Sequence, residues 1–299
     1  MTKFYSHGKL LLTGEYMVLR GADALAIPTK MGQSLEFESN DSKTLKWESW
    51  DSNNQLWFNT TFNLQDFSIS NTNDSEIAIR LAQILKVIRD QKNNFLSENG
   101  GKVKTHLEFD RHWGLGTSST LISNLARWSG VDPYELLQNS FGGSGYDIAC
   151  ATAKSPLVFR KQPLEPHVEK CAFDPPFKSS LYFVYLNQKK NSREGIESFK
   201  KQNIREELIA YTSGLTRAVI RAHTLSEFEQ ILNEHEDFIS QILSLVPVKE
   251  KLFPDFQGAI KSLGAWGGDF ILATGDKHTP DYFKNKGFKI VTTYEEMFG

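Results

Sequence analysis

The sequence predicts a two-domain protein that contains both β-sheets and α-helices, and three observations support this prediction. A chain of 299 residues exceeds the usual size of a single domain, so two compact domains are expected. The first 70 residues alternate apolar and polar positions in short runs, such as LEFES from Leu35 and KWESW from Lys46, which indicates antiparallel strands. A stretch rich in proline and charge at residues 161–178 is typical of a surface connection. We therefore expect domains at residues 1–170 and 171–299.

Helices in the first half are predicted by apolar spacing and by capping residues. Apolar side chains share one face of a helix that begins near Asn73, which stands in capping-box spacing with Glu76. A later helix ends at Gly130, a residue favoured after the last helical turn. The next helix is expected to begin at Asp132 with Pro133 in its first position.

The second half is expected to continue the mixed pattern. It offers a strand in SLYFVYL from Ser180 and a long helical stretch from about Ile204. Ser226 and Glu229 stand in capping-box spacing before another helix. No repeat of fixed period and no low-complexity tract interrupts these segments.

The composition indicates an ordinary soluble protein. Hydrophobic residues make up 39% and charged residues 23% of the chain, and the formal net charge is -2. This charge disfavours broad binding to nucleic acid or to acidic membranes, and no apolar run of 18 residues predicts a membrane span. Only Cys150 and Cys171 are present, which favours a reducing compartment. We expect a cytoplasmic protein, monomeric or homodimeric, that binds no nucleic acid and no membrane.

A glycine-rich segment, WGLGTSST at residues 113–120, lies between a predicted strand and a predicted helix. Gly114 and Gly116 permit a tight turn, and the start of the helix leaves several backbone N–H groups unpaired. Both these amides and the helix dipole favour an anion, and the hydroxyls of residues 117–119 add partners for phosphate oxygens or a magnesium ion. The segment is neither GxxxxGK[ST] nor GxGxxG. Taken alone, an ordinary glycine turn with a Ser or Thr cap fits these residues as well.

Lys9 and Asp147 are the two charged residues that the pattern singles out for phosphoryl transfer. Lys9 stands between a glycine and an apolar, strand-like run, where a fixed strand would hold its ammonium group in a site. Asp147 lies in GGSGYDIA, whose glycines allow the backbone to approach a ligand. A solvated lysine and a turn-capping aspartate are the structural alternatives.

Three segments together resemble the signature motifs of the GHMP kinases: GKLLLTGEYMVLRGADALAIP, WGLGTSST and KSLGAWGGDFILA. That family includes galactokinase, homoserine kinase, mevalonate kinase and phosphomevalonate kinase. The resemblance implies an α+β, two-domain GHMP kinase fold, with a ribosomal-protein-like βαβ amino-terminal domain that binds the nucleotide and a ferredoxin-like carboxy-terminal domain. It also implies ATP and Mg²⁺ as cofactors and a small molecule as the substrate.

The same resemblance assigns roles to individual residues. Asp147 would orient or deprotonate the acceptor hydroxyl, while Lys9 would stabilise charge on the migrating phosphoryl group. Ser118 would also bind the magnesium ion. The expected nucleotide-binding residues are Gly114, Leu115, Gly116, Thr117, Ser118 and Ser119. The expected substrate-binding residues are Glu15, Tyr16, Ser144, Gly145, Gly264 and Ala265.

The expected reaction transfers the γ-phosphoryl group of ATP to a hydroxyl or phosphate of an isoprenoid-pathway metabolite, phosphomevalonate or mevalonate. The GGD triplet at residues 267–269 is similar to the last motif of phosphomevalonate kinases, and a basic run at Lys189, Lys190 and Arg193 would suit a phosphorylated substrate. Three departures from the family pattern are present: the proline that usually opens the middle motif is replaced in DRHWGLG, Leu136 replaces a magnesium-binding Glu of mevalonate kinases, and Trp266 replaces a glycine. A GHMP-fold protein that binds a nucleotide or metabolite without catalysis is one alternative. A GHMP kinase for a sugar or an amino acid is another.

Overall fold

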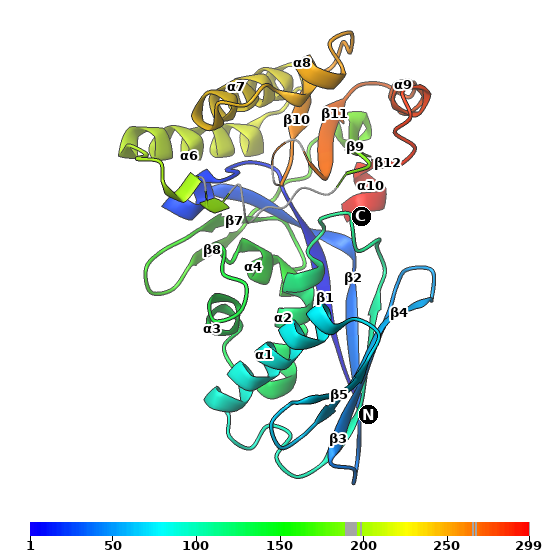
Figure 1. The fold of residues 1–299 in the computed structure, drawn as a ribbon. Helices are drawn as coiled ribbons and strands as arrows, with labels where there is room; N and C mark the ends of the chain where they lie inside the picture. The colour runs from blue at the N-terminus through cyan, green and yellow to red at the C-terminus, as the bar shows by residue number, and fades with distance from the viewer. Residues whose placement is uncertain (189–195, 198, 265, 267, 299) are drawn as a thin grey trace. The chain divides into compact units, whose positions relative to one another are not determined.

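The computed structural model describes residues 1–188, 196, 197, 199–264, 266 and 268–298, and these residues form two compact units (Figure 1). Unit 1 consists of residues 1–8, 31–111 and 115–152, and unit 2 of residues 9–30, 112–114 and 153–299. The long strands β1 (Thr2–Leu11) and β2 (Ala24–Asn40) contribute residues to both units. The two units are thus interleaved along the chain.

Unit 1 is a sheet with helices packed on it. The strand order β5-β4-β3-β6-β2 is antiparallel except for the parallel pair β3 and β6. Its remaining elements are β3 (Thr44–Trp50), β4 (Leu56–Asn63), β5 (Ile69–Thr72), β6 (Gly100–Leu107), α1 (Ser75–Gln91), α2 (Thr117–Ser129), α3 (Pro133–Gln138) and α4 (Tyr146–Thr152). Helices α1 and α2 lie on one side of the strands (Figure 1), and apolar residues of both helices and the strands form one core.

The apolar alternation predicted in the first 70 residues is confirmed in unit 1. KWESW lies in β3, where the buried Trp47 and Ser49 alternate with more exposed residues. LEFES lies in β2, where Leu35 is buried and Phe37 is partly buried against the same core. The buried members of this pattern include Leu35 and Trp47, both in the core of unit 1. A strand with side chains on alternate faces buries every second residue, so period-two hydrophobicity directs one face to the core.

Two of the predicted helix boundaries in unit 1 are confirmed and one is shifted. Asp132 caps α3 by accepting hydrogen bonds from the amides of the second and third helical residues, and Gly130 ends α2 with φ +73°. The cap of α1 is Asp74, whose side chain accepts from Glu76 N and Ile77 N. The predicted cap Asn73 instead accepts from Asn59 N, because one residue of extra strand pairing precedes the helix.

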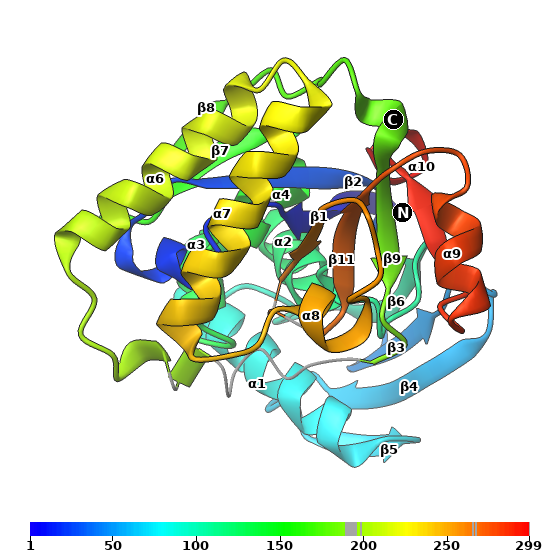
Figure 2. The ribbon, with the colours of Figure 1, turned by 90° about the horizontal axis from the view of Figure 1, so that it is seen from above.

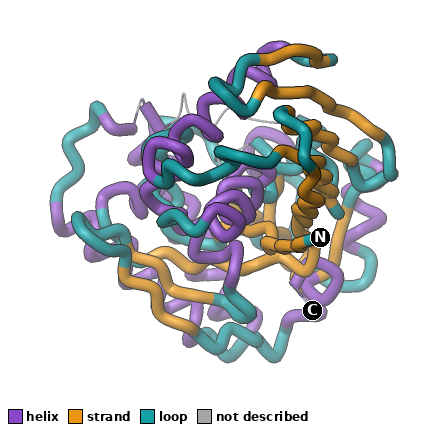
Figure 3. The backbone as a smooth tube through the Cα atoms, turned by 90° about the horizontal axis from the view of Figure 1, so that it is seen from below, coloured by secondary structure: helices purple, strands orange, loops and turns teal. Residues whose placement is uncertain are grey.

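Unit 2 contains a four-stranded antiparallel sheet in the order β10-β11-β9-β12, with helices around it (Figure 2). Helices α6 and α7 run side by side (Figure 2). Its elements after the 3-10 helix η1 (Met17–Arg20) are β7 (Leu157–Arg160), β8 (His167–Lys170), the 3-10 helix η2 (Lys178–Ser180), β9 (Leu181–Tyr185), α6 (Glu206–Arg221), α7 (Leu225–Leu243), α8 (Val248–Leu252), β10 (Ile260–Ser262), β11 (Phe270–Thr274), α9 (Thr279–Asn285), β12 (Val291–Thr293) and α10 (Tyr294–Phe298). Strands and helices can be followed by colour in Figure 3.

Two sequence predictions in unit 2 differ from the structure. The stretch at residues 161–178, expected to be a connection, contains β8, which pairs with β7 as an antiparallel hairpin. The cap of α7 is Thr224, which accepts from Glu227 N, whereas Glu229 accepts a hydrogen bond from Thr274 Oγ1. Ser226 and Glu229 have capping-box spacing, but Thr224 and Glu227 share that spacing and precede them, so spacing alone does not choose between the pairs.

No helix within the described residues is long and apolar enough to cross a membrane.

Candidate phosphate loop and active site

The predicted phosphate loop ends at the first turn of α2. Gly116 precedes the helix with φ +99°, a left-handed conformation that favours glycine. The first backbone bond of the helix runs from Thr120 N to Gly116 O at 2.9 Å. The amides of residues 117–119 come before this bond, and glycine has no side chain with which to cap them. This helix start therefore has the donors and the dipole direction that suit an anion.

The hydroxyl groups after the glycines have different surroundings. Ser118 is exposed, whereas Ser119 is buried and donates to Gly116 O at 3.0 Å. Thr120 donates to Gln33 Oε1 at 2.7 Å, which ties the helix to β2. Leu115 is fully buried. Of the two serines of the loop, Ser118 is the one whose side chain faces solvent, as a ligand of magnesium or phosphate must.

The other end of the loop, Gly114, is held by two charged residues of unit 2. Lys9 Nζ donates to Gly114 O at 2.8 Å, so the predicted catalytic lysine contacts the first glycine of the predicted loop. Gly114 has φ +69°, and a Cβ atom built on it would lie 2.1 Å from Asp269 Oδ2. Both the backbone conformation and the close carboxylate exclude a side chain at this position.

Asp269 is a residue of the candidate site to which the sequence analysis gave no role. Its side chain packs on Gly114, and its carbonyl accepts from Leu186 N at 2.9 Å at the entry to β11. In the sequence, the GGD triplet supports only a family resemblance. A carboxylate next to two glycines could have indicated a site residue, but its contact partner, Gly114, is distant in sequence.

Asp147, the predicted base, lies in the first turn of α4 in unit 1. It is half-buried, and its Oδ1 accepts from Ile148 N at 3.1 Å. The preceding Gly145 is buried with φ +96° and accepts from Ile148 N and Ala149 N, which starts the helix. Helix α4 packs against α2, so within unit 1 the helix that carries Asp147 neighbours the helix of the phosphate loop.

The predicted site residues are divided between the two units. Residues 115–119, Ser144, Gly145 and Asp147 belong to unit 1, and Lys9, Gly114, Glu15, Tyr16 and Gly264 belong to unit 2. Ala265 lies outside the described residues, as do Lys189, Lys190 and Arg193. Within the part of the chain that is described, no three His, Cys, Asp or Glu side chains are close enough to hold a metal ion.

Glu15 lies in a buried cluster of charged side chains. Its Oε1 accepts from Lys261 Nζ at 2.6 Å, and both side chains are fully buried. Glu236 Oε2 lies 3.8 Å from the same ammonium group and accepts from Ser262 N. His235 Nε2 accepts from Gly14 N at 3.1 Å. These contacts connect residues 14–16 to α7 and β10, with the ammonium group of Lys261 between the two glutamates.

Burial controls the ionisation of this cluster. It raises the pKa of Glu15 to about 7, although the charge of Lys261 acts in the opposite direction. Burial likewise raises the pKa of Glu236 and lowers that of His235 well below its ordinary value. His235 is therefore neutral near pH 7. The substrate contact predicted for Glu15 stays a prediction, and the observed contact is the ion pair.

Trp266 and Tyr16 both contribute to an apolar cluster of unit 2. Trp266 is 1% exposed and packs with Met17, Phe199 and Ile239. Its φ of +48° is the conformation that a glycine would adopt without strain. The Tyr16 ring lies 5.6 Å from the ring of Phe199. The bulky ring that replaces a glycine of the family pattern is thus part of the core.

Comparison with solved structures identifies the fold. Methanococcus jannaschii mevalonate kinase aligns with a TM-score of 0.70 at 16% identity over 98% of this chain and 96% of that chain. Streptococcus pneumoniae phosphomevalonate kinase, solved with phosphomevalonate and AMPPNP, gives 0.70 at 15% over 98% of each chain. Lactococcus lactis galactokinase with galactose gives 0.70 at 13% over 98% and 92%. The chain has the GHMP kinase fold.

The predicted α+β, two-domain class is confirmed with this fold. A scan of the sequence against models of protein families gives no match, and a search of curated proteins gives no significant match. The sequence resemblance therefore depends on the three short motif segments alone. Identity of 13–16% to the solved GHMP kinases establishes the fold and leaves the acceptor open.

Proposed function

We propose that this protein is an ATP-dependent small-molecule kinase. The observation that carries the proposal is the contact between Lys9 Nζ and Gly114 O, which joins the lysine of the first motif segment to the first glycine of the second. Two segments far apart in the sequence meet where a phosphoryl-transfer enzyme requires a cation beside a phosphate loop. The GHMP kinase fold, shared with a mevalonate kinase, a phosphomevalonate kinase and a galactokinase, supports the same proposal.

The start of α2 suits the phosphates of ATP. The amides of residues 117–119 precede the first helical hydrogen bond, and Gly116 leaves them open to a ligand. Ser118 contributes an exposed hydroxyl that would bind Mg²⁺ together with phosphate oxygens, since Mg²⁺ is commonly held by few protein groups. When bound, the ion would neutralise charge on the transferred phosphoryl group.

Lys9 would act on the transferred phosphoryl group, and Asp147 would act on the acceptor hydroxyl. The ammonium of Lys9 has three N–H donors, and its bond to Gly114 O fixes the side chain at the head of the loop. A cation fixed there would stabilise negative charge that develops on the phosphoryl group. Asp147 would accept a proton from the acceptor hydroxyl or orient it. Its position in the first turn of α4 is held by the glycines before it.

For the acceptor we propose phosphomevalonate or mevalonate, a hydroxyl or phosphate of the isoprenoid pathway. The SGYD and GGD segments support this choice by their resemblance to those branches of the family, and kinases of both names share the fold. Asp269, the last residue of the GGD triplet, lies with its side chain against Gly114. A sugar is the second candidate, because Lactococcus lactis galactokinase aligns with the same TM-score.

Steady-state ATP turnover tests the proposal, with mevalonate, phosphomevalonate, homoserine, galactose and heptose phosphate as acceptors. One acceptor should support turnover well above the ATPase background. Asp147→Ala should lower that turnover by about 10²-fold or more and leave nucleotide affinity unchanged. Asp237→Ala is the matched control, because Asp237 is an exposed aspartate on α7 outside the proposed site.

Two results would contradict the proposal in different ways. Retained turnover in Asp147→Ala would remove Asp147 from the catalytic role. Nucleotide binding without turnover on any acceptor of the panel would favour the alternative, a GHMP-fold protein that binds a nucleotide or metabolite without catalysis. Binding of ATP is measured separately from turnover, so the two failures are distinguishable.

A further inference from the structure

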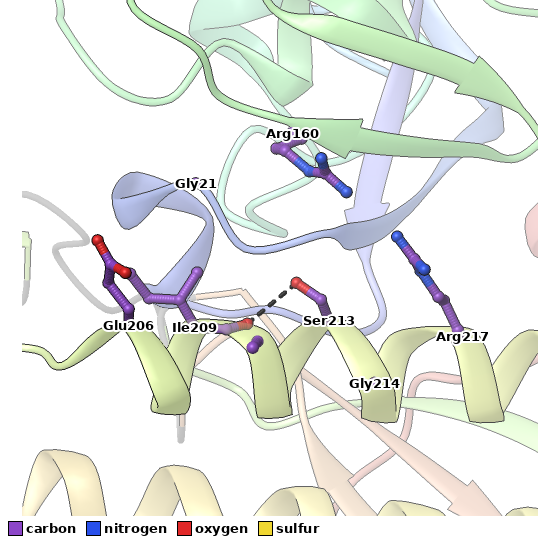
Figure 4. Close-up of a pocket in the computed structure, with 8 residues that line it drawn as sticks. Gly21, Arg160, Glu206, Ile209, Ser213, Gly214 and Arg217 are labelled. Atoms are coloured by element: carbon purple, nitrogen blue, oxygen red, sulfur yellow. Dashed lines mark hydrogen bonds between the residues drawn. The ribbon is translucent and has the colours of Figure 1, made fainter.

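A pocket of about 600 Å³ lies within unit 2 among η1, β7 and α6 (Figure 4). Its volume falls in the range of small-molecule sites. It is lined by Gly21, Arg160, Glu206, Ile209, Ala210, Ser213, Gly214 and Arg217. None of these residues is among those assigned to phosphoryl transfer. The pocket therefore needs an explanation of its own.

Two arginines of this pocket are fixed by one buried carboxylate. Asp23 is 1% exposed, and its Oδ1 accepts from Arg160 Nε at 2.6 Å. Its Oδ2 accepts from Arg217 Nε at 3.0 Å and from Arg217 Nη2 at 2.8 Å. Figure 4 shows Arg217 rising from α6 and Arg160 approaching from the other side of the pocket. Both guanidinium groups are held before any ligand arrives, which lowers the entropic cost of binding.

The two arginines carry more charge than Asp23 neutralises. Within the described part of the chain, neither guanidinium has a second carboxylate at ion-pair distance, so this end of the pocket keeps an excess of one positive charge. The side chains of Arg160 and Arg217 remain 36% and 56% exposed. Each guanidinium has five N–H donors, and Asp23 engages the edge formed by Nε and Nη2. Among the described residues no partner of either Nη1 group is found, so these groups remain for a ligand.

The other residues that line the pocket have small side chains or lie far from the two arginines. Gly21, Ala210 and Gly214 have small or no side chains, and Ser213 is occupied by hydrogen bonds to Ile209 O and from Asp23 N. Glu206 lines the pocket from the first turn of α6, three turns before Arg217, which is roughly 16 Å along a helix. The pocket is thus cationic at one end only.

We propose that this pocket binds the anionic group, a phosphate monoester or a carboxylate, of a small metabolite through the outer edges of Arg160 and Arg217. Two guanidinium forks present paired donors in the geometry that such oxyanions accept. Asp23 positions both forks and does not contact the ligand. The proposal goes beyond the kinase function and is independent of it, because it concerns binding without ATP.

Binding of inorganic phosphate and of malonate to the full chain, at constant ionic strength and without nucleotide, tests this proposal. The side-chain Nε–H signals of Arg160 and Arg217 in ¹⁵N-edited NMR spectra are the local readout, assigned with Arg160→Gln and Arg217→Gln. At least one anion should shift both signals saturably in the wild type. A response to phosphate alone identifies a phosphate ligand, and a response to malonate alone identifies a carboxylate.

Arg217→Gln should weaken the affinity by about tenfold or more, the loss typical of a charge-assisted hydrogen bond. Arg221→Gln is the matched control, since Arg221 is exposed on the same helix, one turn on, and does not line the pocket. It should stay within about twofold of the wild type, as should Glu206→Gln, because distant exposed charges interact weakly. Arg217→Lys keeps a cation beside Asp23 and should also weaken binding through loss of the fork.

Two results would overturn the proposal. The first is that neither anion moves the two arginine signals of the wild type. The second is an equal loss of affinity in Arg217→Gln and Arg221→Gln, which would indicate unspecific attraction to positive charge. Neither result bears on turnover, and loss of turnover in Asp147→Ala does not bear on this pocket.

Discussion

Replacing Trp266 by glycine tests whether the ring of this residue belongs to the core. The side chain is 1% exposed and packs with Met17, Phe199 and Ile239, while its backbone has φ +48°. Two effects of Trp266→Gly therefore oppose each other. Loss of the ring destabilises the core, and glycine relieves the left-handed backbone.

The magnitudes decide which effect prevails. Truncation of a buried Trp costs about 3–5 kcal/mol, whereas a left-handed non-glycine residue costs about 1–2 kcal/mol. We therefore expect Trp266→Gly to lower the free energy of unfolding by about 1–4 kcal/mol. Trp266→Ala removes the ring but keeps the backbone cost, so it should be less stable than Trp266→Gly by about 1 kcal/mol.

Equilibrium unfolding in urea, followed by circular dichroism, measures both differences. The expected order of stability is wild type, then Trp266→Gly, then Trp266→Ala. A glycine variant as stable as the wild type would refute the packing argument. An alanine variant at least as stable as the glycine variant would refute the backbone argument. ATP turnover of the glycine variant at a temperature where it is folded then tells whether the ring affects function.

Two further predictions concern the loop and the buried cluster. Gly114→Ala should abolish nucleotide binding, measured by calorimetry, because its Cβ would lie 2.1 Å from the carboxylate of Asp269 and its φ is +69°; binding equal to that of the wild type would contradict this geometry. The pKa of Glu15 is raised from 4.5 to about 7, so its contribution to stability is full below about pH 4.5 and lost as the pH rises through about 7. His235, whose pKa is lowered, gives the opposite slope below its ordinary value of 6.5. The quantity to measure is therefore the difference in unfolding free energy between the wild type and Glu15→Gln, which should change by at most about 3 kcal/mol across this window. A difference that does not depend on pH would contradict the assignment.

Local rules in the sequence account for much of the fold of each unit. Period-two hydrophobicity predicts β2 and β3, because strand geometry alone decides which residues face the core. Asp132 followed by Pro133 predicts the start of α3 for a similarly local reason. The caps at Asn73 and Ser226 were wrong because several residues near each start can cap a helix. The choice between them depends on how far the preceding strand or turn extends.

The candidate site shows where local rules end. The glycines at 114 and 116 predict a turn with left-handed residues, and both have positive φ. The contacts of that turn are long-range. Lys9 bonds to Gly114 across 105 residues of sequence, and Lys261 bonds to Glu15 across 246. Sequence spacing does not predict contacts between such distant positions. From the sequence alone, Glu15 could therefore contact a substrate or form an ion pair.

The sequence by itself determined the motifs, the positions that require glycine and the mixture of strands and helices, because these depend on backbone conformation and on periodic burial. Only the tertiary structure decided which way each side chain is used. In the folded chain, Trp266 packs in the core and Glu15 is buried with Lys261. Asp269 lies against Gly114. Arg160 from a strand and Arg217 from a helix bind one buried aspartate. These pairings depend on contacts between distant segments, whose free energy is realised only when the chain has folded.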